Sequence, residues 1–270
     1  MRFTVFGAGG FIGGTLAQSL RAEGADVVAL SRDDEVPPGP LGYVVYAIGI
    51  TADFRERPFE TLEAHVTLPA RLLRECDFSS FLYLSSTRIY RHACATAEDT
   101  AISVNPAEPE DLYDLTKLMG EAVCHRSRRE NVRVARLSNV IGEDFRSANF
   151  VFDLIRAAWR DGSVQLRSSL DSAKDYILVE DVVRMLPRIA VDGTASCYNL
   201  ASGINLKHAE IIAPILQVSG ATVAVAADAV TTVAPPVDIT RVRTEFGFSP
   251  LSVPPALASL TQTFGRSFNA

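Results

Sequence analysis

Length, composition and charge restrict the classes to which this chain can belong. It has 270 residues, of which 47% are hydrophobic and 21% are charged. This is an ordinary globular balance that argues against disorder. The net charge of −6 disfavours a nucleic-acid-binding surface, which is normally basic. No apolar run approaches the roughly 18 residues of a membrane span, and the N-terminus lacks a signal-peptide pattern. We therefore expect a globular cytoplasmic protein that binds neither nucleic acid nor membrane.

The cysteines give no sign of a metal site or of disulfides. Cys76, Cys94, Cys124 and Cys197 are far apart, and no two of them form a C-x-x-C pair. We expect buried or partly buried free thiols, as is usual in a reducing compartment, and no bound metal.

In the first half of the chain, short apolar runs alternate with helical patterns. Continuous apolar strands joined by helices indicate a parallel sheet that is covered on both faces. Right-handed crossovers then give a doubly wound α/β sheet. Strands are expected at 3–6, 27–30, 43–48, 81–84 and 132–137, and helices at 15–23, 59–76 and 110–128.

The second half is less regular. Helices are expected at 150–161, 179–189, 207–216 and 255–264, with a short strand at 198–200. We expect a dinucleotide-binding domain over residues 1–140, to which 176–200 return. Residues 141–175 and 201–270 would form a smaller C-terminal substrate lobe.

The connection between the second and third strands is too short for a complete dinucleotide-binding sheet. Residues 31–42 contain Pro37, Pro38 and Pro40. A complete half of a dinucleotide-binding fold has a helix and another strand at this point. Twelve residues with three prolines cannot form both. The outer strand after Arg32 should therefore be missing or vestigial.

A glycine pattern links the first strand to the first helix. Gly7 allows a tight turn, Gly10 lets the backbone approach a pyrophosphate, and Gly13 lets the helix pack closely on the strand. The free amides at the helix start, around Phe11 and Ile12, would then hold the diphosphate. This context, strand before and helix after, predicts a dinucleotide site.

The end of the second strand indicates which dinucleotide is preferred. An acidic residue there would bind the adenosine ribose of NAD, but this chain has Ser31 and Arg32. A guanidinium suits the 2′-phosphate of NADP, although Asp33 and Asp34 partly offset its charge. We predict NADP, with NAD possible. Further cofactor contacts are expected at Ala47, Ile48 and Gly49, which end the third strand.

Tyr113 and Lys117 lie four residues apart in an expected helix and so share one face. Lysine is scarce in this chain, which makes the pair informative. An ammonium about 5 Å from a phenol, at an effective dielectric near 20, stabilises the phenolate by roughly 3 kcal/mol. We therefore predict that Lys117 lowers the pKa of Tyr113 by about two units, towards the range useful for proton transfer.

Hydroxyl side chains follow the fourth strand of the sheet. Ser85, Ser86 and Thr87 stand where the carboxyl ends of parallel strands face the ligand crevice. A hydroxyl there can donate a hydrogen bond to a substrate oxygen and steady the tyrosine.

These motifs, in this order, resemble those of the extended short-chain dehydrogenase/reductase family, the nucleotide-sugar epimerase and dehydratase group. The glycine pattern matches the phosphate loop, Ser86 stands four residues before Tyr90 as the active-site Ser/Thr does, and Tyr113 and Lys117 match Tyr-x-x-x-Lys. Later segments also match: Arg136-Leu-Ser-Asn139-Val-Ile-Gly142, Lys174-Asp175-Tyr176-Ile177-Leu178-Val179, Tyr198 to Gly203 and Phe246 to Pro250.

The resemblance implies a Rossmann-like fold, a catalytic Ser86-Tyr113-Lys117 set, and substrate contacts at Thr87, Asn139 and Lys174. It also implies a homodimer that pairs two long helices of each subunit. The 4,6-dehydratases of the family carry Thr-Asp-Glu where this chain has Ser86-Thr87-Arg88. GDP-fucose synthase carries a cysteine at the position of Arg88. Neither reaction is therefore expected.

Three functions stay open at this point. The first is an NADP(H)-dependent oxidoreductase that reduces a keto group, or oxidises an alcohol, on a nucleotide-linked sugar. The second is a nucleotide-sugar C4 epimerase that retains its NAD(P) and uses the same three residues. The third is a non-catalytic NAD(P)-binding regulatory protein. The intact serine, tyrosine and lysine favour an enzyme.

Overall fold

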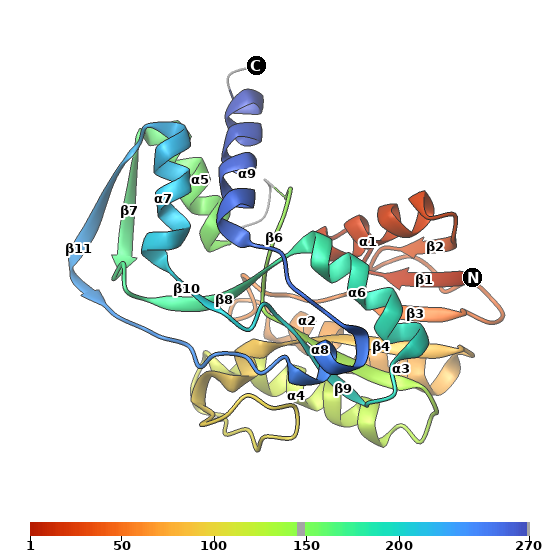
Figure 1. Ribbon diagram of the computed structural model, residues 1–270. Helices are drawn as coiled ribbons and strands as arrows, with labels where there is room; N and C mark the ends of the chain where they lie inside the picture. The colour runs from red at the N-terminus through yellow and green to blue at the C-terminus, as the bar shows by residue number, and fades with distance from the viewer. Residues whose placement is uncertain (145–148, 269–270) are drawn as a thin grey trace.

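The computed structural model describes residues 1–144 and 149–268, and a six-stranded parallel sheet lies at its centre (Figure 1). The order of the strands across the sheet is β2-β1-β3-β4-β5-β9. This is the expected doubly wound arrangement. The strands are β1 (Arg2–Phe6), β2 (Asp26–Leu30), β3 (Tyr43–Tyr46), β4 (Ser80–Ser86), β5 (Val132–Leu137) and β9 (Cys197–Leu200).

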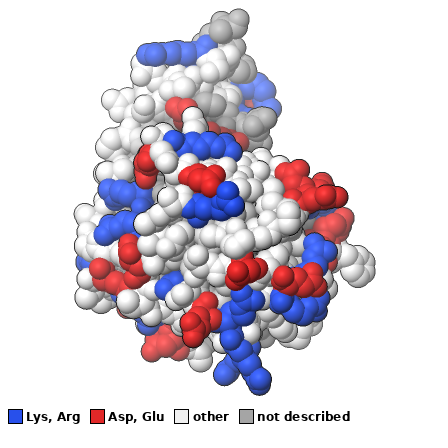
Figure 2. Space-filling view, turned by 90° about the vertical axis from the view of Figure 1, so that its right-hand side faces the viewer, with Lys and Arg blue, Asp and Glu red and all other residues white. Residues whose placement is uncertain are grey.

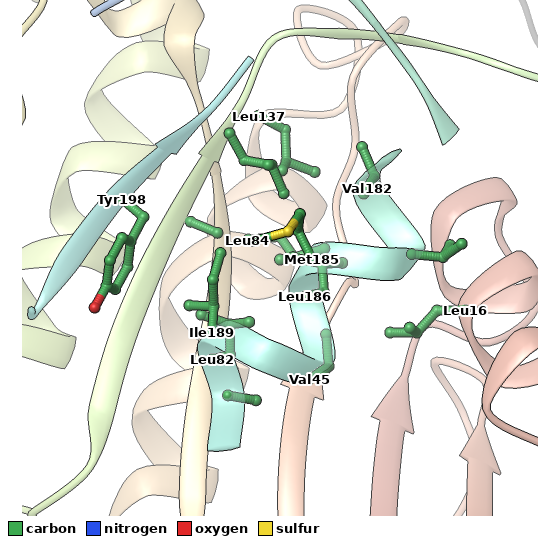
Figure 3. Packing of buried hydrophobic residues seen from close by; sticks show 14 of the residues in the cluster. Leu16, Val45, Leu82, Leu84, Leu137, Val182, Met185, Leu186, Ile189 and Tyr198 are labelled. Atoms are coloured by element: carbon green, nitrogen blue, oxygen red, sulfur yellow. The ribbon is translucent and has the colours of Figure 1, made fainter. Parts of the chain in front are cut away.

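Helices cover both faces of this sheet. On one face lie α1 (Phe11–Ala22) and α6 (Val179–Asp192), whose apolar sides pack on the strands (Figure 3). Leu16, Val45 and Leu186 are completely buried there, and each such side chain contributes about 1.5–3 kcal/mol by leaving water. The other face is covered by α2 (Pro58–Leu62), η1 (Glu63–Thr67), α3 (Leu68–Glu75) and α4 (Asp111–Arg126).

The outer strand is missing, as the short proline-rich connection predicts. Residues 31–42, all of which the structure describes, contain no strand, so β2 is the edge of the sheet. The chain returns along the end of the sheet, where the Leu41 carbonyl accepts a 2.7 Å hydrogen bond from Thr4 Oγ1.

The helix expected at 59–76 is interrupted by η1, a single π-helical turn. Such a turn displaces backbone carbonyls from their helical partners. Two tyrosine hydroxyls from adjacent strands bind these carbonyls: Tyr46 donates to Ala64 O at 2.7 Å and Tyr83 donates to His65 O at 2.9 Å. Side chains of the sheet thus fix the irregular turn, and no local sequence signal predicts it.

A second group of elements packs around its own apolar core beside the carboxyl ends of the main strands (Figure 1). It holds a three-stranded sheet, β10-β8-β6, and a two-stranded sheet, β11-β7. Most of its strands were not expected from the sequence. The elements are β6 (Asn139–Ile141), α5 (Phe150–Asp161), β7 (Ser163–Ser168), β8 (Ala173–Leu178), β10 (Asn205–Lys207), α7 (His208–Ser219), β11 (Thr222–Val230) and α9 (Val253–Phe268).

The division into two domains stays a prediction. One segment of the expected substrate lobe packs on the main sheet instead. Helix α8 (Thr240–Phe246) lies within residues 201–270, which were expected in the substrate lobe, yet it packs on the main sheet. There Phe246 packs against Tyr198 of β9, with 5.7 Å between the ring centres.

The surface view shows acidic and basic side chains interspersed on the visible face (Figure 2). Within residues 1–144 and 149–268, no helix is long and apolar enough to cross a membrane. All four cysteines are free, as expected; Cys124 and Cys197 are buried and Cys76 is half-buried. Cys94 is exposed, which corrects the expectation of buried thiols for that residue, because it lies in the irregular segment after β4.

Candidate active site

The glycine turn has the geometry of a phosphate-binding loop. Gly7 adopts a φ of 86°, and a Cβ added at Gly13 would lie 2.3 Å from the Gly7 carbonyl oxygen, so only glycine allows α1 to start this close to β1. Helix α1 begins after Gly10 with no side-chain cap. Its first amides, at Phe11 and Ile12, are therefore open to an anion, and the loop fits a diphosphate.

The end of β2 lies against this turn. A Cβ at Gly9 would lie 3.2 Å from Ser31 Oγ, which places the hydroxyl beside the loop. The Ser31 amide donates a 2.6 Å hydrogen bond to Asp34, so that carboxylate is engaged locally. Arg32 is exposed and has no hydrogen bond or ion pair with any residue that the structure describes.

The segment after β3 completes one edge of the crevice. A Cβ at Gly7 would lie 2.8 Å from the Ala47 carbonyl carbon, so the two turns are in contact. Ile48 is buried, whereas Gly49 is exposed. A Cβ at Gly49 would lie 3.5 Å from Lys117 Nζ. The predicted cofactor-binding segments and the predicted catalytic lysine therefore meet at the carboxyl ends of β1 and β3.

Ser86, Tyr113 and Lys117 converge at the same edge of the sheet. Ser86 ends β4, and its side chain is near enough to Tyr113 on α4 to lower the pKa of the phenol. Tyr113 and Lys117 are both buried, at 6% and 4% exposure. The Lys117 ammonium donates a 2.9 Å hydrogen bond to the Leu84 carbonyl and lies 5.9 Å from the centre of the Tyr113 ring.

The charge relation between these two residues differs from the sequence prediction. Burial raises the pKa of Tyr113 to about 12, against the lowering effects of the Ser86 hydrogen bond and of Arg88. Burial also lowers the pKa of Lys117 to about 7, against the effect of Glu121. Desolvation is the largest cause of both pKa shifts, and Lys117 is not among the causes that act on Tyr113, so the predicted lowering by Lys117 is wrong. In this structure Tyr113 is a neutral phenol, a proton donor rather than a phenolate.

Arg88 joins an ion network that the sequence analysis did not find. Its guanidinium donates to Glu110 Oε2 at 2.6 Å and lies 5.4 Å from the centre of the Tyr113 ring. Glu110 also pairs with Arg55. The neighbouring Phe54, 1% exposed, packs on Tyr113 with 5.5 Å between ring centres. Segments distant in sequence thus enclose the phenol, and only the fold brings them together.

A buried ion pair braces the helix that carries Tyr113 and Lys117. Arg136 of β5 donates to both carboxylate oxygens of Glu121, at 3.0 Å and 2.6 Å, and to Tyr90 Oη at 2.6 Å. Glu121 follows Lys117 by four residues, so a Tyr-x-x-x-Lys-x-x-x-Glu spacing could have revealed it. The pair fixes α4 on β5 and on the segment after β4.

The predicted substrate contacts lie between the main sheet and the second group of elements. Asn139 on β6 uses its amide to donate a 2.7 Å hydrogen bond to Asp175 O, which partly commits the side chain to structure. Thr87 is half-buried just after Ser86. Lys174 on β8 is exposed, yet its surroundings desolvate it and lower its pKa, as does the positive charge of Arg88. Lys174 is thus within electrostatic reach of Arg88.

A groove of about 780 Å³ runs between α5 and β7 in the second group of elements. It is lined by residues that include Phe150, Leu154 and Ser168, and it does not include Ser86, Tyr113 or Lys117. Ser168 lies 3.0 Å from the His208 ring nitrogen, and Lys174 contributes to the lowered pKa of His208 after burial. Ser168 thus connects the groove to a histidine that is affected by the charge of Lys174.

The family model described as "NAD dependent epimerase/dehydratase family" matches residues 40–201, more than half of the chain. The chain belongs to this family. It is a family of enzymes, and its model covers Ser86, Tyr113, Lys117, Asn139 and Lys174, whereas the glycine turn precedes the matched range. The expected family is thus confirmed. No match was found among the curated proteins.

Solved structures show the same fold over almost the whole chain. MoeE5 in complex with UDP-glucose and NAD is 23% identical, with a TM-score of 0.81 and coverage of 99% of this chain and 100% of that one. RMD from Pseudomonas aeruginosa complexed with NADPH is 22% identical, with a TM-score of 0.76 and coverage of 97% and 100%. UDP-glucuronic acid 4-epimerase from Bacillus cereus is 18% identical, with a TM-score of 0.79 and coverage of 99% and 100%. The first of these structures contains NAD and the second contains NADPH.

Proposed function

We propose that this protein is an NADP(H)-dependent oxidoreductase that reduces a keto group, or oxidises an alcohol, on a nucleotide-linked sugar. The observation that carries the proposal is the meeting of Ser86, Tyr113 and Lys117 beside the glycine turn. A buried neutral phenol, whose pKa the neighbouring Ser86 lowers, is placed to give a proton to a carbonyl oxygen.

Each of the three side chains has a separate part in the reaction. Tyr113 donates its proton to the substrate oxygen, and Ser86 holds the same oxygen by a hydrogen bond. The pKa of Lys117, about 7, lets it exchange a proton near neutral pH and restore the phenol. When bound, the dinucleotide supplies or accepts the hydride. In the oxidative direction Tyr113 must accept the proton of the substrate hydroxyl. Only its ionised form can do so, and the raised pKa makes that form a strong base.

The cofactor proposal rests on the two turns that border the crevice. The open amides after Gly10 would hold the diphosphate, and Ser31 and Arg32 would contact the adenosine half. An exposed guanidinium with no ionic partner in the described structure supports a 2′-phosphate, and a charge-assisted contact gives a roughly 10- to 150-fold preference. We therefore expect Arg32→Ala to weaken NADPH binding by at least tenfold and to leave NADH binding within about threefold.

Fluorescence titration of NADPH and NADH checks this preference, with Arg2→Ala as the control, since Arg2 is an exposed arginine at the opposite end of the sheet. Tighter binding of NADH than of NADPH by the unaltered protein would contradict the assignment of Arg32.

The nucleotide part of the substrate has a separate place in this proposal. The groove between α5 and β7 is of the size that binds small ligands. Lys174 is electrostatically coupled both to Arg88 and to His208, which contacts Ser168 of the groove. Lys174 would then contact the diphosphate, and Thr87 and Asn139 the sugar. This arrangement supports a nucleotide-linked sugar over a free sugar.

Replacing Tyr113 tests the chemistry directly. Tyr113→Phe keeps the ring packing on Phe54 and removes only the hydroxyl, so we expect turnover to fall by about 10²–10⁴-fold with the fold intact. Ser86→Ala should lower turnover by a smaller factor, because one hydrogen bond to the oxygen is lost. The assay is steady-state kinetics on a panel of 4-keto and 4-hydroxy nucleotide sugars.

Undiminished turnover in Tyr113→Phe would remove Tyr113 from the mechanism. The purified protein also separates this function from C4 epimerisation, which uses the same three residues. A reductase requires added cofactor, whereas tightly bound oxidised cofactor and activity without any addition would indicate the epimerase.

We also propose that the protein is a homodimer that pairs α2 and α4 of each subunit. Large apolar side chains are exposed on both helices: Phe59 and Leu62 on α2, at 82% and 46%, and Met119 on α4, at 54%. Exposed apolar groups on neighbouring helices favour a partner of the same kind.

A further inference from the structure

His65 is a completely buried histidine that neither the sequence motifs nor the proposed chemistry uses. It lies on the π-helical turn η1, between the segment after β3 and helix α4. The Ile50 amide donates to its Nε2 at 3.2 Å, and its Nδ1 lies 2.8 Å from Thr116 Oγ1. Both ring nitrogens therefore have a partner.

The partners allow only one protonation state. The Ile50 amide is always a donor, so Nε2 must accept and carry no proton. Thr116 uses its hydroxyl proton in a 2.9 Å hydrogen bond to the Tyr113 carbonyl, so its oxygen is left to accept from Nδ1. His65 is thus the neutral Nδ1–H tautomer. Burial lowers its pKa to about 2, with help from the nearby Lys117 charge, which keeps the ring neutral.

This hydrogen-bond chain joins the two sides of the crevice. One end holds the backbone directly after Ala47-Ile48-Gly49, and the other reaches the backbone of Tyr113. The imidazole also packs edge-on against the Tyr113 ring, with 5.3 Å between centres. A Cβ at Gly49 would lie 3.4 Å from His65 Nε2 and 3.5 Å from Lys117 Nζ. The imidazole and the ammonium therefore lie beside the same exposed glycine.

We propose that His65 is a positioning residue of the dinucleotide site: as a locked tautomer, it holds the Ala47–Ile50 backbone in register with Tyr113 and Lys117. The inference rests on the proposed function, because it assigns the segment after β3 to cofactor binding. Its ligand is the dinucleotide, which His65 affects only through the backbone of Gly49 and Ile50.

The Thr116 hydroxyl gives the sharpest test. Thr116→Val removes the acceptor for Nδ1–H and leaves the imidazole in place. The proton can then move to Nε2, where it opposes the Ile50 amide. We expect the dissociation constant for NADPH to rise at least tenfold, while turnover at saturating cofactor falls less than threefold. Thr116→Ser keeps the acceptor and should stay within twofold of the unaltered protein in both quantities.

A second measurement needs no ligand. In protein labelled with ¹⁵N-histidine, ring-nitrogen spectra should show His65 as the Nδ1–H tautomer, without titration between pH 5 and pH 9. His65→Phe assigns the signal by its loss. In Thr116→Val the signal should shift towards a mixture of tautomers, and in Thr116→Ser it should not.

Three results would overturn the role of His65: an Nε2–H tautomer, a His65 that titrates in this range, or NADPH binding by Thr116→Val as tight as that of the unaltered protein. If the unaltered protein binds no dinucleotide, the proposed function fails instead, and the spectra still decide the tautomer.

Discussion

At the scale of single residues, burial decides the charges of the candidate site. From the sequence, Lys117 is expected beside Tyr113 in an effective dielectric near 20, where the Coulombic attraction between ammonium and phenolate dominates. In the structure both side chains are almost completely buried, and desolvation disfavours each charged form. Tyr113 therefore keeps its proton, and Lys117 binds its extra proton much less tightly than an exposed lysine does.

A buried lysine with a low pKa should reduce the stability of the folded protein. The pKa of Lys117 is about 7 when folded and 10.5 when unfolded, so folding favours the neutral amine. Its contribution is most unfavourable below pH 7 and vanishes as the pH rises to about 10.5. This pKa difference can destabilise the folded protein by at most about 5 kcal/mol. The hydrogen bond to Leu84 O offsets about 1 kcal/mol of that cost.

We therefore expect Lys117→Met to abolish turnover yet raise the free energy of unfolding by about 1–3 kcal/mol at pH 7. The gain should shrink towards pH 10. Urea unfolding at pH 7, 8.5 and 10 measures it, with Lys207→Met as the control because Lys207 is exposed. A variant that is less stable than the parent by the same amount at every pH would contradict the argument.

At the scale of elements, two glycines in the turn between β1 and α1 have different roles, one in folding and one in binding. A Cβ at Gly13 meets two backbone atoms of Gly7, at 2.3 Å and 2.7 Å, and neither can move without displacing the strand. A Cβ at Gly10 meets only the Gly7 carbonyl oxygen, at 3.3 Å, and Gly10 has a φ of −92°, which alanine adopts readily. The two glycines therefore serve different purposes.

We expect Gly13→Ala to lower the free energy of unfolding by about 3 kcal/mol or more. Gly10→Ala should lower it by less than about 1 kcal/mol, yet weaken NADPH binding at least tenfold, because a Cβ at this position of the motif would collide with a bound pyrophosphate. Chemical denaturation and fluorescence titration of both variants check the pair. Unchanged binding by Gly10→Ala would mean that the diphosphate does not lie on this turn.

At the scale of the whole molecule, the unpartnered apolar side chains of α2 and α4 predict how copies assemble. Placing a charge among them should cost several kcal/mol. We expect the unaltered protein to be a dimer by light scattering and Met119→Glu to be a monomer. Ile204→Glu, which alters an equally exposed side chain away from these helices, should remain a dimer. A monomeric unaltered protein would refute the assignment.

Much of the main sheet could be predicted because its signals are local. Continuous apolar runs such as 81–84 mark buried parallel strands, and the prolines of 31–42 rule out an outer strand. The strands beside the carboxyl ends of the main sheet were missed. Many residues of β7 and most of β11 are exposed or half-buried, so their apolar pattern is weak. Their pairing also joins residues about 60 positions apart.

The sequence by itself determined the family, the glycine turn, and the spacing of Tyr113 and Lys117 on one helical face, because each depends on residues close together in the chain. Only the tertiary structure decided their charges and supports, among them Arg88 over the phenol and His65 between Ile50 and Thr116. Burial and hydrogen-bond partners are properties of the packed fold, since they depend on which distant segments exclude water from the same point.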